Sequence, residues 1–177
     1  MRNELSQEQA QNIIRGKRSK AAGVQFERLI DRACGYYMVI GKAKIEKQAE
    51  PVHYIRPIGR AGQFVANYAK KSGVDYKGTL QGGKSVCFEA KHTDTDRFSY
   101  NRVEEHQLQY LYEHYKLGAE CFVLVSFGLT DFYRIPFQSW CNMKEQFGRQ
   151  YITQDETLEP YRVQYKQGNI LFLEGLQ

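Results

Sequence analysis

The stretch GVDYKGTLQGGKSVCFEAKHT, residues 73–93, decides the fold because it holds two strand-like runs around a short loop. Residues 74–80 and 84–91 are rich in β-branched, aromatic and alternating residues. The loop Gln81-Gly82-Gly83 between them is typical of a β-hairpin turn. The sequence therefore predicts two antiparallel strands, and every other segment is read as support for this hairpin.

The predicted register places two acidic side chains opposite each other. If Leu80 pairs with Lys84, then Asp75 lies directly opposite Glu89, with their Cβ atoms roughly 4.5 to 5.5 Å apart. Carboxylates this close repel each other, and unless one of them is protonated, a divalent cation such as Mg²⁺ or Mn²⁺ would compensate. Lys91, two residues after Glu89 and on the same polar face, would lie beside a metal-bound phosphate.

The plainer alternative is an exposed hairpin whose acidic and basic side chains are simply solvated. A β-bulge near Gly73 or Gly78 would also move Asp75 along its strand. On the opposite face the same register gathers an apolar set that would pack in a core: Val74, Tyr76, Val86, Phe88 and Ala90. Both faces are therefore consistent with this register.

Asp75 followed at hairpin distance by Glu89-Ala90-Lys91 resembles the motif of PD-(D/E)XK nucleases. More narrowly, the chain resembles the RecU-type Holliday junction resolvases. The matching segments are DYKG at residues 75–78, FEAKHT at 88–93, His106-Gln107, and GVQFE at 23–27. The resemblance implies an α/β, restriction-endonuclease-like core, with a mixed central sheet flanked by helices and a projecting stalk. It also implies a homodimeric, Mg²⁺-dependent endonuclease that cuts four-way DNA junctions in pairs of symmetric nicks.

The resemblance also implies roles for individual residues. Asp75 and Glu89 would bind the metal, with Gln107 as a third ligand through its amide oxygen. Lys91 would stabilise the transition state or orient the attacking water, and Glu27 would reach the metal through water. For Glu27 and Gln107 the ordinary alternative is a solvated side chain on a helix.

One position departs from the family pattern. RecU-type resolvases commonly carry a threonine two residues before the aspartate, where this chain has Gly73. A backbone carbonyl or a water would have to replace the missing hydroxyl there.

Composition favours a globular protein with a polyanionic partner. The 177 residues are 42% hydrophobic, and a formal charge of +5 accompanies 13 Tyr and 10 Phe. The four cysteines lack the spacing of a zinc site and are expected to be reduced thiols: Cys34, Cys87, Cys121 and Cys141. With neither a signal peptide nor an apolar membrane span in the sequence, we expect a cytoplasmic protein that does not enter a membrane.

We expect residues 1–177 to form one nuclease domain with a basic N-terminal arm at residues 1–20. Ser6 and Gln9 predict a short helix through about Arg15, and a basic stretch follows that is either a solvated linker or a phosphate-contacting arm. The basic residues of this arm are Arg15, Lys17, Arg18 and Lys20. A second helix, over residues 19–40, carries apolar residues at helical spacing and should dock on the sheet.

Residues 51–71 break both periodicities and predict a stalk-like insertion. Its cations and aromatic rings suit phosphate contacts and base stacking, and in RecU-type resolvases such a stalk enters the junction centre. The alternative is an insertion whose aromatics pack on the domain. The candidate DNA-binding residues here are Arg56, Arg60, Phe64, Tyr68, Lys70 and Lys71.

The remaining elements are expected to support the hairpin. A first strand is predicted over residues 43–47, a buried central strand over 121–127 and a neighbouring strand over 132–135. A helix over about 103–117 should end at Gly118 and turn one apolar side inward, formed by Leu108, Leu111, Tyr112 and Tyr115. Another helix should follow Pro136, and residues 161–173 are read as a strand or hairpin.

Three functions fit these features. The first is a metal-dependent nuclease that resolves four-way junctions. The second is a PD-(D/E)XK nuclease acting on other DNA, such as linear duplex. The third is a module that binds branched DNA without cutting it, although such a module has no need of Asp75, Glu89 and Lys91 in register.

Overall fold

The computed structural model describes residues 7–49, 52–59, 62–68 and 73–176. Its central feature is a six-stranded sheet in the order β1-β4-β5-β7-β8-β10. The strands are β1 Ala43–Lys47, β4 Tyr76–Leu80, β5 Ser85–Thr93, β7 Glu120–Phe127, β8 Asp131–Pro136 and β10 Arg162–Val163. Strands β5 and β7 are parallel, whereas the other neighbouring pairs are antiparallel. The predicted α/β fold with a mixed central sheet is confirmed.

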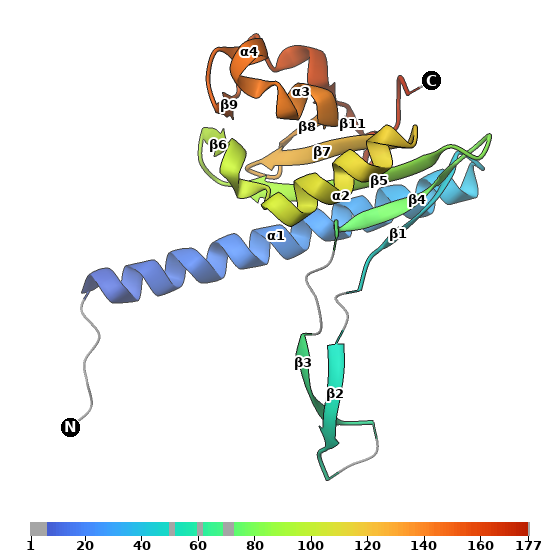
Figure 1. Cartoon of the computed structure of the whole chain (residues 1–177). Coiled ribbons are helices and arrows are strands. Elements are labelled where there is room, and N and C mark those ends of the chain that lie inside the picture. Colours follow the sequence, from blue (N-terminus) through green and yellow to red (C-terminus); the bar gives the residue numbers. More distant parts are fainter. Residues whose placement is uncertain (1–6, 50–51, 60–61, 69–72, 177) are drawn as a thin grey trace.

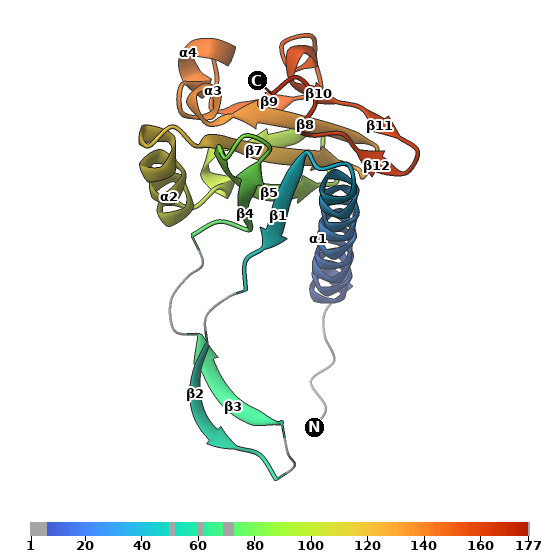
Figure 2. The same ribbon diagram turned by 90° about the vertical axis from the view of Figure 1, so that its right-hand side faces the viewer.

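Helices cover both faces of this sheet (Figures 1 and 2). Helix α1, Gln7–Val39, packs on one face, and α2, Glu105–Lys116, packs on the other as the crossover between β5 and β7. Two short helices, α3 Phe137–Cys141 and α4 Met143–Phe147, extend the second layer. The single helix expected after Pro136 is thus divided at Asn142.

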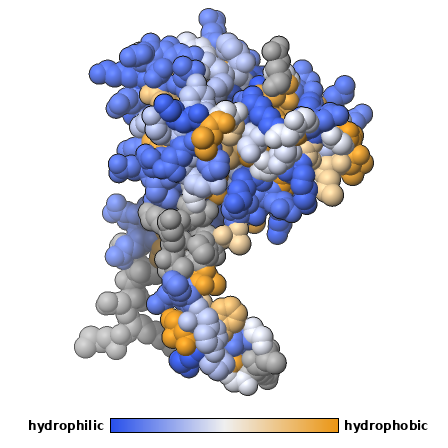
Figure 3. Space-filling model, turned by 45° about the vertical axis from the view of Figure 1, so that its right-hand side comes forward, coloured by the Kyte–Doolittle hydropathy of each residue, from blue (hydrophilic) through white to orange (hydrophobic). Residues whose placement is uncertain are grey.

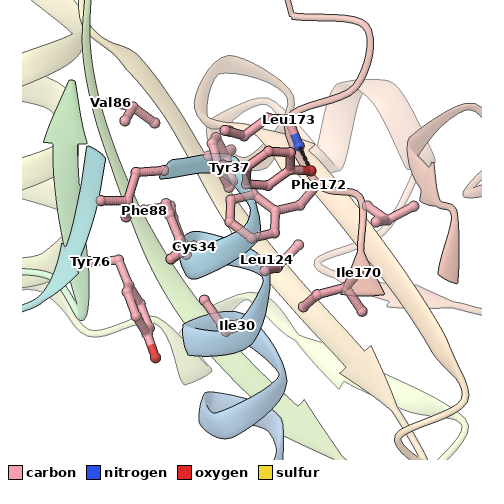
Figure 4. Packing of buried hydrophobic residues seen from close by; sticks show 14 of the residues in the cluster. Ile30, Cys34, Tyr37, Tyr76, Val86, Phe88, Leu124, Ile170, Phe172 and Leu173 are labelled. Carbon is pink, nitrogen blue, oxygen red and sulfur yellow. Dashed lines mark hydrogen bonds between the residues drawn. The ribbon is translucent and has the colours of Figure 1, made fainter. Parts of the chain in front are cut away.

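The core on the α1 side is built from stacked aromatic rings. Phe88 lies between Tyr76 and Phe122, at centroid distances of 5.0 and 4.6 Å. Tyr37 of α1 packs edge-on against Phe172, and its hydroxyl accepts a hydrogen bond of 3.0 Å from the Leu173 N–H (Figure 4). Each such buried ring contributes about 1.5 to 3 kcal/mol. This core holds β4 and β5, and therefore the predicted acidic pair, on a rigid base.

The second core lies under α2 and contains Leu111, Val123 and Trp140. The inward face of α2 differs from the prediction, because Tyr112 and Tyr115 are 48% and 40% exposed. Leu111 is buried and Leu108 packs against this core, as predicted, and Gln107, one helical turn before Leu111, is buried as well. The prediction is thus correct for the two leucines and wrong for the two tyrosines, because helical spacing alone does not show how far around the helix the buried face extends.

Helix α1 is continuous, so the predicted break after Arg15 is wrong. Gly16 lies inside it and costs only about 1 kcal/mol relative to alanine, which is too little to end a long helix. Its second half docks as predicted through Phe26, Ile30 and Tyr37. Its first half extends beyond the sheet and is exposed, so the basic residues of the expected arm lie on a helix (Figure 1).

Strands β2, Val52–Pro57, and β3, Phe64–Tyr68, form an antiparallel hairpin that projects away from the sheet (Figures 1 and 2). The rings of Tyr54 and Phe64 lie 5.7 Å apart, and the two side chains are 62% and 48% exposed. These two aromatics therefore pack on each other and not on the domain, and the hairpin surface mixes polar and apolar residues (Figure 3). Arg60, Lys70 and Lys71 lie outside the described residues.

Short elements complete the chain. Strands β6, Arg97–Ser99, and β9, Tyr151–Thr153, pair with each other, as do β11, Tyr165–Lys166, and β12, Asn169–Ile170. Two 3₁₀ helices, η1 Tyr100–Arg102 and η2 Glu159–Tyr161, connect larger elements. All four cysteines are free thiols, as predicted. Among the described helices, none has the length and apolar character needed to cross a bilayer.

Candidate active site

The hairpin of β4 and β5 has the predicted register, with Tyr76 paired to Phe88 and no shift between Tyr76 and Thr79. The loop closes through a 2.8 Å hydrogen bond from the Leu80 N–H to the Lys84 carbonyl. Gly78 is required here, because a Cβ atom at this position would lie 2.0 Å from the Lys44 carbonyl oxygen of β1. Strand β4 begins at Tyr76, directly after Asp75, so the predicted strand starts later than expected.

The side chains of Asp75 and Glu89 each accept a hydrogen bond from the backbone of the opposite segment. The Asp75 N–H donates to Glu89 Oε2 over 3.2 Å, and Asp75 Oδ2 accepts from the Ala90 N–H over 3.0 Å. At this end of the hairpin, side-chain hydrogen bonds thus replace the strand pairing. The two carboxylates are brought together on adjoining segments, as the register predicted.

Glu89 is fully buried, which the prediction of a polar outer face did not anticipate. Helix α2 covers this face, where Cys87 also belongs to the second core. Glu89 Oε1 lies 2.7 Å from Lys91 Nζ and accepts a 2.6 Å hydrogen bond from Gln107 Nε2. The Lys91 side chain is 21% exposed, so its ammonium group lies at the edge between the buried carboxylate and solvent.

Burial, the largest cause, and the negative charge of Asp75 together raise the pKa of Glu89 to about 8, against the lowering effect of Lys91. A buried carboxylate whose ionised form is disfavoured gains most from a cation, because a cation offsets both the lost hydration and the repulsion. Asp75 and Glu89 therefore place together two carboxylate groups of the kind that could bind a divalent ion.

Gln107 lies in the first turn of α2, where it completes a capping box with Glu104. Its amide oxygen accepts a 3.0 Å hydrogen bond from the Glu104 N–H, while its amide nitrogen donates to Glu89. In this arrangement the oxygen points to the helix cap. The predicted ligand role would require the amide to turn over and lose both hydrogen bonds, so it stays a prediction.

Glu27 is held elsewhere, by a 2.7 Å ion pair with Lys47 of β1. Within the described chain, no three His, Cys, Asp or Glu side chains gather closely enough to bind a metal together. Glu27 is thus not brought into one ligand cluster with Asp75 and Glu89. Lys47 was missed in the sequence, because only the three-dimensional pairing of α1 with β1 reveals it.

Tyr110 explains the glycine at position 73. A Cβ atom there would lie 2.2 Å from Tyr110 Cδ2, so the ring of α2 fills the space that a side chain would need. The departure from the family pattern at Gly73 is therefore matched by an aromatic residue distant in sequence.

We expect Gly73→Thr to lower the free energy of unfolding by about 1 to 3 kcal/mol, because the new side chain overlaps Tyr110. Denaturant titration of Gly73→Thr, Tyr110→Ala and the double variant should give a favourable coupling of about 0.5 to 3 kcal/mol. Gly35→Thr is the control, since position 35 has open space around it. Strict additivity of the two substitutions would contradict this account.

The candidate DNA-binding residues fall into two groups. Arg15 and Arg18 of α1 line a hollow of about 860 Å³ beyond the end of β5, with Arg102 on its opposite wall. Lys17 and Lys20 are exposed on the same helix, whereas Arg56 and Phe64 are exposed on the distant hairpin. Arg102 was missed in the sequence, because the residues around it show neither helical nor strand periodicity.

Comparison with known proteins agrees with the motifs. The family model described as Recombination protein U matches residues 21–177. The Holliday junction resolvase RecU of Bacillus pumilus is 33% identical over 146 residues, which cover 77% of this chain and 70% of that protein. The protein of the same name from Oenococcus oeni is 29% identical over 168 residues, covering 89% and 79%.

A solved structure of Hjc from Archaeoglobus fulgidus, a Holliday junction resolvase, gives a TM-score of 0.47 at 15% identity. It covers 78% of this chain and 93% of the Hjc chain. The family match spans both Asp75 and the Glu89-Ala90-Lys91 segment, together with the hairpin insertion. This chain belongs to the RecU family of recombination proteins.

Proposed function

We propose that this chain is a metal-dependent endonuclease that resolves four-way DNA junctions by paired, symmetric phosphodiester cleavage. The observation that carries the proposal is the convergence of Asp75, Glu89 and Lys91, with Lys91 Nζ 2.7 Å from Glu89 Oε1. The relatives named Holliday junction resolvase RecU support the choice of substrate. As a recombination and repair enzyme it would act in the cytoplasm.

Asp75 and Glu89 would hold Mg²⁺, with Mn²⁺ as a substitute. Such an ion supplies charge neutralisation at the phosphate and a water of lowered pKa. Lys91 places a positive charge beside these carboxylates, where it would stabilise the charge that develops on the phosphate oxygens. We therefore assign Lys91 electrostatic stabilisation and not a role as base.

Gln107 and Glu27 would act less directly. The Gln107 amide donates to Glu89 and fixes the rotamer of that carboxylate, so we propose that it positions a metal ligand. Glu27 is proposed to reach the metal through water, with its carboxylate held by Lys47. Both roles predict smaller losses of activity than substitution of Asp75 or Glu89.

The two separate basic surfaces suit a branched substrate. Arg15, Lys17, Arg18 and Lys20 on α1 would contact backbone phosphates near the active site. The hairpin residues would contact the junction at a distance from it, with Arg56 for phosphate and Phe64 and Tyr68 for stacking. Arg60, Lys70 and Lys71 lie outside the described residues and are included by their sequence alone. Two symmetric cuts require two active sites, which a two-fold homodimer provides.

Removing the exposed hairpin aromatics should weaken junction binding specifically. We expect the double substitution Tyr54→Ala and Phe64→Ala to weaken the free energy of junction binding by about 1 to 3 kcal/mol per stacked base, with linear-duplex binding unchanged. Because neither ring packs on the domain, Tm should not fall. Tyr112→Ala is the control, since Tyr112 and Phe64 have the same exposed fraction of 48%. An equal loss of affinity for the junction and for linear duplex would argue against a hairpin that recognises branched DNA.

The experiment that tests the function incubates the protein with a synthetic four-way junction and a linear duplex, in Mg²⁺ or EDTA, beside Asp75→Ala. Paired nicks on the junction alone, absent in EDTA and in the variant, support the proposal. Cutting of both substrates would favour a nuclease for other DNA. Junction binding without cutting in any metal would leave a non-catalytic binding module.

A further inference from the structure

The hollow beyond β5 has two walls of unlike origin. One wall is the exposed first half of α1, which contributes Arg15 and Arg18. The other is the end of β5 and the segment that follows, which contribute Thr93, Asp94, Thr95 and Arg102. The space between them, about 860 Å³, has room for a segment of nucleic-acid backbone.

Arg102 is held in place before any ligand arrives. One guanidinium nitrogen donates a 3.0 Å hydrogen bond to the His92 carbonyl, and the guanidinium carbon lies 4.5 Å from the centroid of the Phe98 ring. These two contacts leave the remaining donors of a planar fork free to face the hollow. A fixed guanidinium loses little conformational entropy when it binds an anion.

The charge in this hollow is not balanced internally. Burial lowers the pKa of Arg102, but an arginine remains protonated at physiological pH. Among the described residues, Arg15, Arg18 and Arg102 form no ion pair with a carboxylate. Asp94 is the carboxylate in the lining, and its Oδ1 lies 2.9 Å from His92 Nε2. Three guanidinium groups against one engaged carboxylate favour an anionic ligand.

The hollow continues the line of the candidate active site. Thr93 lies two residues beyond Lys91 on β5, which is roughly 7 Å along a strand. The carbonyl that fixes Arg102 belongs to His92, the residue directly after Lys91. A DNA strand that has one phosphate at Lys91 would therefore have a neighbouring phosphate at the mouth of this hollow.

We propose that Arg102 is a phosphate-binding positioning residue, which holds the phosphodiester next to the one cleaved while Arg15 and Arg18 contact the backbone from the opposite wall. The inference rests on the proposed nuclease function and deepens it. Arg102 does not touch the reacting atoms. It sets where along the strand the cleaved bond lies, because a bidentate fork fixes both the position and the orientation of a phosphate.

The test compares Arg102→Gln and Arg102→Lys with Arg97→Gln in the full chain. Arg97 is the matched control, because it also stacks on an aromatic ring, 4.0 Å from the Tyr151 centroid, but lies outside the lining of the hollow. Junction affinity is measured against salt in the absence of divalent metal, and single-turnover cleavage is measured in Mg²⁺ with the cut sites mapped. Thermal melting checks that each variant is folded.

We expect Arg102→Gln to weaken junction binding about tenfold and to reduce the slope of log K against log salt by about 1. At saturating DNA the single-turnover cleavage rate of this variant should fall, and its cuts should be distributed over several neighbouring phosphodiester bonds. Arg102→Lys should restore the salt slope, because lysine keeps the positive charge. It should not restore cleavage at a single bond, because lysine lacks the planar guanidinium group that binds a phosphate through two hydrogen bonds. Arg97→Gln should leave both unchanged.

The outcomes separate this proposal from the function on which it rests. If the wild type cuts junctions and Arg102→Gln behaves like Arg97→Gln in salt slope and cut position, the positioning role is wrong and the nuclease stands. If the wild type cuts nothing while Arg102→Gln still lowers the salt slope, the phosphate contact stands and the nuclease is wrong. An Arg102→Gln protein that does not fold is replaced by Arg102→Lys, whose unchanged cut position would overturn the proposal.

Discussion

Glu89→Gln is expected to reduce junction cleavage by roughly a thousandfold or more while leaving the protein at least as stable as the wild type. The substitution keeps the size of the side chain and an oxygen that can accept from Lys91 and Gln107. It removes the negative charge that a divalent ion needs. Because the site is fully buried and adjoins Asp75, that charge also destabilises the metal-free fold when it is present.

The stability effect has a definite sign. Burial and the neighbouring Asp75 charge raise the pKa of Glu89 from 4.5 to about 8 in the folded chain, so folding favours the protonated form. The contribution to stability is fully present below about pH 4.5 and is lost as pH rises through 8. Glutamine does not ionise, so the advantage of Glu89→Gln in Tm should grow between pH 6 and 9 in EDTA.

Glu156→Gln serves as the control, because the substitution makes the same chemical change at an exposed position away from the site. It should alter neither cleavage nor the pH profile of Tm. A Glu89→Gln protein that cleaves junctions at a tenth of the wild-type rate or faster would remove Glu89 from the proposed metal ligands.

Metal affinity should rise steeply with pH, by about tenfold per pH unit between pH 6 and 8, and then level off. Below pH 8 the Glu89 carboxyl is mostly protonated in the folded chain, and the ion must displace that proton. Titration calorimetry with Mg²⁺ in buffers of different ionisation enthalpy would measure the protons released per bound ion. This number should be close to one at pH 6.5 and close to zero at pH 9.

The same titration on Asp75→Asn separates the causes of the pKa shift. Burial is the larger cause and the Asp75 charge the second, so Asp75→Asn should retain part of the elevation of the Glu89 pKa while losing most of the affinity. In contrast, Mg²⁺ affinity that is flat between pH 6 and 8 in the wild type would mean either that Glu89 is already ionised or that the metal is bound without it, and both results contradict this prediction.

The central hairpin was predictable because strand alternation and loop length fix its register. A one-residue slip would turn Phe88 away from the core beneath α1 and turn Glu89 toward that apolar core, so the alternation favours the pairing of Tyr76 with Phe88. Val86, Phe88 and Ala90 contact the core that also contains Tyr37 of α1, as expected for one face of β5.

Other features depended on contacts that no local pattern records. The burial of Glu89 follows from α2 covering the face that alternation marked as polar. The orientation of the Gln107 amide is set by the Glu104 N–H at a helix cap. The clash that excludes a side chain at Gly73 comes from Tyr110, 37 positions later in the chain. Each of these is a tertiary contact, and sequence periodicity reports only which face of an element is apolar.

A backbone hydrogen bond joins the base of the projecting hairpin to Asp75. Strands β1 and β4 are neighbours in the sheet, and the chain leaves the first and enters the second across a 2.7 Å hydrogen bond from the Gln48 N–H to the Asp75 carbonyl. A displacement of the hairpin would therefore act on the backbone of Asp75, whose side chain is a proposed metal ligand.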